Sequence, residues 1–153
     1  MITKNLTTLF HRELEALKLE LEAYANPSKL WMIDKGISNS GGNLALHLVG
    51  NLNHFIGFKL GNTGYIRQRD LEFSDKGIPV SEIISRIDDT KIMIETTLEQ
   101  LKEEDLFKET KIHDSRPAMT IEFFLLHLLS HLSYHLGQIN YHRRLLDTIK
   151  TEH

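Results

Sequence analysis

The chain contains no cysteine among its 153 residues. This absence excludes disulfide bonds, thiolate metal ligands and a protein thiol acting as a nucleophile. Because thiolates are missing, any zinc or iron site in the chain must be built from nitrogen and oxygen ligands.

Long apolar runs and an excess of positive charge are also missing. The N-terminal segment lacks the uninterrupted apolar core of a signal peptide. No segment approaches the roughly 18 consecutive apolar residues of a membrane span. The formal net charge is -3 with neutral histidines, whereas nucleic-acid binding normally needs a basic stripe. We therefore expect a cytoplasmic protein that binds neither nucleic acid nor membranes.

Proline is scarce, and none of the 3 prolines interrupts a segment with helical spacing of apolar residues. Four such segments are present, and their spacing predicts amphipathic helices. The expected helices cover about residues 3–25, 43–60, 79–103 and 120–148. The segment 65–73 has too brief an alternation for a strand to be predicted.

Four amphipathic helices without a clear strand predict an all-α protein, folded as a four-helix bundle. The length of the chain fits a single domain over residues 1–153. Two of the connections are long enough for neighbouring helices to run parallel, so the helix order stays open at this point.

The segment "HLLSHLSYHLGQ" (127–138) places a histidine at every fourth position: His127, His131 and His135. Residues four apart in a helix lie about 40° around the axis and about 6 Å along it. Two such histidines can bind one metal ion at a Zn–N distance of about 2.0–2.1 Å. His127 and His135 would be about 12 Å apart along the axis. One ion would therefore use either the first pair of histidines or the second.

A metal site is not the only interpretation of this row. The histidines could instead face solvent or line a polar seam. The protease motif HExxH is excluded, because Leu128 and Leu132 stand where it needs a glutamate. A third ligand would decide, and His47 lies near the apolar edge of the second expected helix. A lone histidine there is more often a hydrogen-bonded core residue than a ligand.

Three motifs, "LHLVGNLNHFIG" (46–57), "RQRDLEF" (67–73) and "HLLSHLSYHLGQI" (127–139), recur in this order in a known family. The chain resembles the DinB-like superfamily of DinB/YfiT-like metalloenzymes, in a branch of unknown function. The resemblance implies a four-helix bundle of up-down-down-up order. It also implies a divalent metal ion bound by His47, His131 and His135.

Other residues of these motifs are candidates for the surroundings of the metal. Asn51 and Gln138 are expected to hydrogen-bond the ligand rings and fix their tautomers. His127 matches a position that is not usually a ligand, and we expect it behind the ligands or on the surface. His54 is expected to line the cavity. Arg67 and Arg69 either form a salt-bridged loop or receive an anionic substrate.

Three neutral imidazoles leave an open coordination position on a divalent ion. Zinc and nickel are favoured, with iron and manganese as alternatives. The resemblance implies an enzyme with a small-molecule substrate: a metal-dependent hydrolase, or an S-transferase using an external low-molecular-weight thiol such as bacillithiol. No general acid or base is identified.

The alternative is a non-catalytic, metal-stabilised bundle with a stress-related or binding role. The resemblance also implies a homodimer, for which a leftover apolar stripe on the first helix could serve as the interface.

Overall fold

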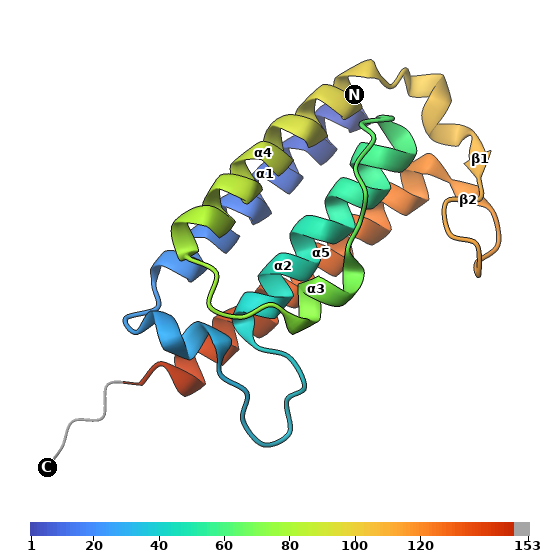
Figure 1. Cartoon of the computed structure of the whole chain (residues 1–153). Coiled ribbons are helices and arrows are strands. Elements are labelled where there is room, and N and C mark those ends of the chain that lie inside the picture. Colours follow the sequence, from blue (N-terminus) through green and yellow to red (C-terminus); the bar gives the residue numbers. More distant parts are fainter. Residues whose placement is uncertain (149–153) are drawn as a thin grey trace, which may run out of the picture.

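The structure is a computed structural model that describes residues 1–148 (Figure 1). Residues 149–153, which the predicted domain includes, lie outside the described residues. The chain is mostly helical, as predicted. Its α-helices are α1 (Ile2–Glu22), α2 (Gly41–Leu52), α3 (Arg69–Ser74), α4 (Val80–Gln100) and α5 (Ile121–Leu146). Among residues 1–148, none of the helices combines the length and the apolar character that a membrane crossing requires.

The four longer helices bury their apolar stripes in one common core. Helix α1 packs against α4 and α5, and α2 packs against α3, α4 and α5 (Figure 1). The buried stripe of α1 consists of Leu6, Phe10, Leu14, Leu17 and Leu21. Burial of each such side chain stabilises the fold by about 1.5–3 kcal/mol. The expectation of a leftover apolar stripe on this helix is therefore wrong, because its partners are α4 and α5.

Helix α2 begins two residues before its predicted start, because Ser40 caps it. The Ser40 hydroxyl accepts a hydrogen bond from the backbone N–H of Asn43 at 3.1 Å, which satisfies a free donor of the first turn. The helix then continues as a π-helix, η2 (Asn53–Leu60). Apolar spacing alone does not distinguish this wider helix from an α-helix. Asn62, with φ 50°, follows its end.

The long connection after η2 contains α3, a helix that the sequence did not predict. With only six residues, such a helix is too short to be stable by itself. Tertiary contacts hold it: the side-chain amide of Asn43 donates to the backbone carbonyls of Glu72 and Asp75, at 3.0 and 2.9 Å. These bonds fix the "RDLEF" segment against the start of α2.

The connection between α4 and α5 contains a 3-10 helix, η3 (Glu103–Phe107), and two short strands. Strand β1 (Glu109–Thr110) pairs antiparallel with β2 (Met119–Thr120). No strand was predicted here, since two residues carry no readable alternation. Helix α5 starts directly after β2, where the Thr120 hydroxyl accepts from the backbone N–H of Phe123 at 3.2 Å.

At the other end of the molecule, a buried pair joins α5 to the segment after α1. The Tyr24 hydroxyl donates to Nδ1 of His142 at 2.6 Å. Nε2–H of His142 donates to the Met32 carbonyl at 2.8 Å. This pair anchors the 3-10 helix η1 (Pro27–Trp31) and the loop that leads into α2.

Candidate metal centre

Three histidine side chains from two helices converge on one point. Nε2 of His131 lies 3.2 Å from Nε2 of His47 and 3.1 Å from Nε2 of His135. Nitrogen ligands at 2.0–2.1 Å from a tetrahedral ion would be separated by roughly 3.3–3.4 Å. This cluster, the histidine cluster below, could therefore hold a metal ion. His127 is not part of it, so the structure brings together the second of the two possible pairs on α5.

A buried carboxylate orients the ring of His47. Nδ1–H of His47 donates to Oε1 of Glu72 at 3.1 Å, which leaves the Nε2 lone pair directed at the other two histidines. Arg67 donates to both oxygens of the same carboxylate, at 2.9 Å from Nε and 2.8 Å from Nη2. Glu72 is only 6% exposed. The arrangement matches the carboxylate–histidine pairs that fix metal ligands.

The charge of Glu72 is maintained despite its burial. Burial raises the pKa of the Glu72 carboxyl, but the hydrogen bonds from His47 and Arg67 together outweigh it and leave the pKa below its ordinary value. Sequence reasoning missed this residue as a ring partner. The available signal was the "RDLEF" motif, which supported the family resemblance but received no structural role.

The other two rings of the cluster differ in their hydrogen bonding. Nδ1–H of His135 donates to Oε1 of Gln138 at 2.7 Å, the contact for which Gln138 was a candidate. Nδ1 of His131 is buried and has no hydrogen-bond partner among the described residues. Oδ1 of Asn51 is equally unpaired. Asn51 is thus buried near His47 without hydrogen-bonding its ring.

The rings on α5 resist protonation. Burial, followed by the charges of His135 and His47, lowers the pKa of His131 to about 4. Burial also lowers the pKa of His135, although its hydrogen bond to Gln138 opposes the shift. Both rings are consequently neutral at pH 7, which is the protonation state that a metal ligand needs.

A family model described as "Protein of unknown function (DUF1572)" matches residues 11–152. The chain belongs to this family. A search of curated proteins gives no match. The matched range includes the histidine cluster and Glu72.

Two cavities of this DUF1572 protein border the histidine cluster. The smaller one, about 160 Å³, is lined by His47 and His131 together with residues of the connections before α3 and before α5. The larger one, about 660 Å³, lies between the 34–39 loop and α5, where Tyr134, His135 and Tyr141 contribute to its wall. The histidine cluster therefore borders two separate cavities: His47 and His131 line the smaller one, and His135 lines the larger one.

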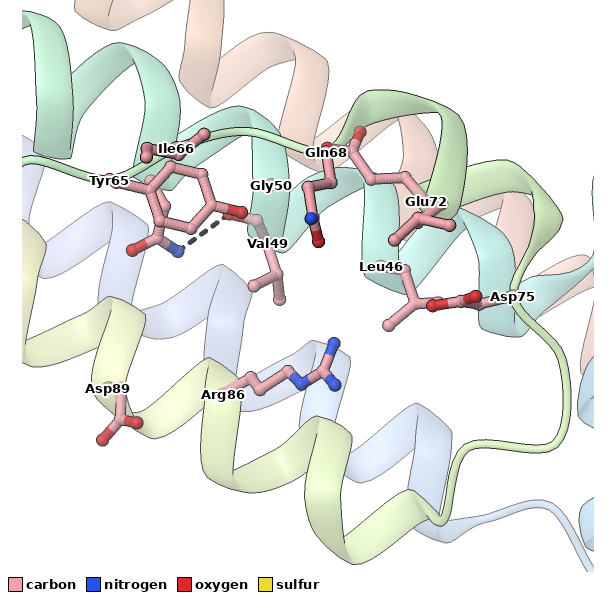
Figure 2. A pocket seen from close by; sticks show the side chains of 12 residues that line it. Leu46, Val49, Gly50, Tyr65, Ile66, Gln68, Glu72, Asp75, Arg86 and Asp89 are labelled. Carbon is pink, nitrogen blue, oxygen red and sulfur yellow. Dashed lines mark hydrogen bonds between the residues drawn. The ribbon is translucent and has the colours of Figure 1, made fainter.

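A third cavity, about 420 Å³, lies between α2, the segment around α3 and α4 (Figure 2). Arg86 lies along α4 at the edge of this cavity and pairs with Glu82 of the same helix (Figure 2). Glu72 lines it, but none of the three clustered histidines does. The cavity in Figure 2 is therefore separate from the histidine cluster.

The remaining predicted residues lie outside the cluster. His127 lines the smaller cavity and its Nε2 accepts a hydrogen bond from Nη1 of Arg116 at 3.4 Å. The ring of His54 stacks on Phe58, with ring centroids 5.8 Å apart. His54 is not among the residues that line the smaller cavity. Its position on the π-helix brings it against neighbouring aromatic rings rather than beside His47.

Proposed function

We propose that His47, His131 and His135 bind a divalent metal ion and leave one coordination position for a small-molecule ligand. The observation that carries the proposal is the separation of 3.1–3.2 Å between Nε2 of His131 and the other two Nε2 atoms. Three mutually close imidazoles have too few protons to satisfy one another by hydrogen bonds, whereas one ion accepts all three lone pairs. Zinc and nickel suit an all-nitrogen site, with iron and manganese as alternatives.

The proposal includes membership of the DinB-like superfamily with its up-down-down-up helix order. The three sequence motifs support this membership, since each contributes a residue to the histidine cluster or to the hydrogen bonds around it. The path of the chain supports the helix order. Helices α1 and α5 run toward the end that carries η1, and α2 and α4 run away from it (Figure 1).

For the reaction we propose S-transfer with an external low-molecular-weight thiol, in preference to hydrolysis. A divalent ion with an open position lowers the pKa of a bound water or thiol. Hydrolysis also calls for a general base. Glu72 is occupied by His47 and Arg67, and no Asp or Glu lines the smaller cavity. The carboxylate that lines the larger cavity, Asp34, is exposed on the 34–39 loop. Because the chain has no cysteine, the thiol has to come from a second small molecule.

The residues around the cluster would bind and orient the reactants. Glu72 and Gln138 hold the rings of His47 and His135, so the open position is fixed relative to both cavities. The larger cavity has the volume of a typical small-molecule site. We assign it to the electrophile, because exposed aromatic side chains of Tyr134 and Tyr141 form part of its wall.

Metal analysis of protein purified without added metal tests the site. We expect about one equivalent per chain in the wild type, a large loss in His131→Ala, and no loss in the control His127→Ala. The control removes a histidine one turn away that is outside the cluster. Circular dichroism verifies that each variant is folded. Equal metal content in the wild type and in His131→Ala would overturn the assignment.

Turnover tests the reaction. The metal-loaded protein is incubated with an aryl halide and, in turn, with several low-molecular-weight thiols. The thiol loses its proton to solvent and its sulfur displaces the halide, so thioether formation and halide release are both measured. We expect product that depends on both metal and thiol. Stoichiometric metal without any thiol-dependent product would leave the site intact and eliminate the transferase.

A second candidate is a metal-stabilised dimeric bundle without catalysis. The observation in its favour is a row of exposed side chains on α5: Tyr134 is 65% exposed, Tyr141 63% and Leu145 70%. Their spacing of seven and four residues places them on one helix face. This candidate predicts a dimer by light scattering that Tyr141→Ser dissociates. It also predicts a fourth protein ligand in X-ray absorption spectra, where the transferase predicts an exchangeable water.

A further inference from the structure

We propose that the smaller cavity binds an oxyanion, a carboxylate or phosphate group, carried by the substrate or by the thiol. Its placement beside a metal ion rests on the proposed function, whereas the binding of the anion itself does not. The lining includes three arginines and four histidines, and it contains no Asp or Glu. The cavity thus has an excess of positive charge.

Two of the three arginines have no carboxylate partner. Arg67 pairs with Glu72 at 2.8 Å. Arg69 lies over the ring of Phe73, with Cζ 5.1 Å from the centroid, and Arg116 donates to a histidine nitrogen. Neither of them forms a salt bridge within residues 1–148. Both side chains are exposed and therefore available to a ligand, and a bound dication would add further positive charge nearby, so the cavity attracts an anion.

Unpaired polar atoms in the wall point independently to a ligand. Asn51 and His131 both line the cavity. Asn51 is only 7% exposed and its Oδ1 has no hydrogen-bond partner among the described residues, as is also true of Nδ1 of His131. A buried polar atom left unpaired costs roughly 1–3 kcal/mol. Nδ1–H of His131 can donate to an oxyanion and so relieve that cost, whereas Oδ1 of Asn51 is itself an acceptor and needs a donor, such as a hydroxyl group of the same ligand.

The size and the walls of the cavity define the kind of group that fits. Its volume of about 160 Å³ is below the roughly 300–1,000 Å³ of sites for whole small molecules. It therefore suits one charged group of a larger ligand. Phe55, Phe124 and Leu128 contribute apolar walls, which reduce the dielectric screening on the inner side of the cavity, while the guanidinium groups of Arg69 and Arg116 lie on its exposed side.

The guanidinium groups favour an oxyanion over other anions. Their planar forks bind carboxylate and phosphate oxygens through paired hydrogen bonds. The reactant held at the histidine cluster is consequently an anionic molecule, with its charged group on the side of Arg69 and Arg116. A neutral thiol or a neutral electrophile would leave this cavity unused.

Calorimetric titration tests the proposal with two probes, inorganic phosphate and malonate, at constant ionic strength. Both metal-free and zinc-loaded protein are titrated. Arg69→Gln and Arg116→Gln are compared with the control Arg144→Gln, an arginine of α5 that lies over Tyr141 and outside the cavity. We expect each cavity variant to weaken the Kd about tenfold, the effect of one charge-assisted hydrogen bond, and the control to leave it unchanged. The probe that binds more tightly identifies the group as phosphate or carboxylate.

Several outcomes separate this inference from the proposed function. Equal affinities of the wild type and both cavity variants would overturn it. Binding that requires zinc and ignores both arginines would also overturn it, because the anion would then bind only the metal. Absence of anion binding by the wild-type protein, with normal metal content, refutes the cavity alone. Anion binding by a protein that holds no metal refutes the proposed function and leaves the cavity.

Discussion

Residue 50 can only be glycine while Glu72 occupies its observed position. A Cβ at Gly50 would lie 1.9 Å from Oε2 of Glu72 and 2.5 Å from its Cδ. No carbon approaches an oxygen so closely without displacement. Since Glu72 orients the ring of His47, the missing side chain on α2 determines the geometry of the histidine cluster.

The first prediction concerns Gly50→Ala. The new methyl group displaces Glu72 and frees the ring of His47, so we expect metal affinity to fall about 10- to 100-fold. Competition with a chelator of known affinity measures the loss. The control is Gly137→Ala on α5, where a Cβ meets nothing within 4 Å. It should leave metal affinity unchanged and stabilise the fold by about 0.5–1 kcal/mol. Unchanged affinity in Gly50→Ala would show that Glu72 does not orient the ligand.

The second prediction concerns the charge of Glu72. Glu72→Gln keeps the shape of the side chain but leaves the partly buried guanidinium of Arg67, whose side chain is 12% exposed, without its counter-charge. We expect a loss of about 3 kcal/mol in the free energy of unfolding, together with weaker metal binding. Urea denaturation provides the measurement. The matched control, Glu82→Gln, breaks an exposed pair with Arg86 and should cost less than about 1 kcal/mol. Similar losses in both variants would contradict the role of burial.

The third prediction is a dependence of stability on pH in the metal-free protein. The pKa of His131 is lowered to about 4 from its ordinary 6.5. Between these values the unfolded chain binds the proton and the folded chain does not. Stability should therefore be full above pH 6.5 and fall as the pH drops toward 4. Denaturation midpoints at pH 7.5, 6 and 5 measure the slope. His131→Gln should reduce this slope, and an identical slope in both proteins would be inconsistent with the shifted pKa.

The fourth prediction separates folding from metal binding. Tyr24→Phe removes the hydroxyl that donates to Nδ1 of His142 and leaves a buried acceptor unpaired. We expect the free energy of unfolding to fall by about 1–3 kcal/mol. Metal content should not change, because His142 is not part of the cluster. Loss of metal from a folded Tyr24→Phe variant would contradict this prediction. It would mean that the Tyr24–His142 pair affects the histidine cluster, although no hydrogen bond in the described part of the chain joins them.

Local spacing was sufficient for much of the fold. The apolar periods predicted the four longer helices. Such patterns depend on residues within one or two turns of each other, which the sequence displays directly. The boundaries were less accurate, since Ser40 and the π-helix extend or alter α2 through contacts that periodicity does not encode.

The candidate site divides in the same way. His131 and His135 could be read from their spacing of four residues, because one helix places both rings on the same side. That spacing did not decide between this pair and His127 with His131, and it did not bring in His47. Only the family resemblance proposed the complete set of three.

The sequence by itself determined a mostly helical chain without thiolates and a regular row of histidines. The tertiary structure decided which of those histidines meet, that His47 joins them from α2, and that Glu72 fits against Gly50 to hold it. The reason is that the backbone hydrogen bonds of a helix join residues four positions apart. The contacts of the histidine cluster instead join residues 25 to 84 positions apart, and they depend on how the helices pack. The fit between neighbouring side chains and the direction of each ring are defined only in that packed state.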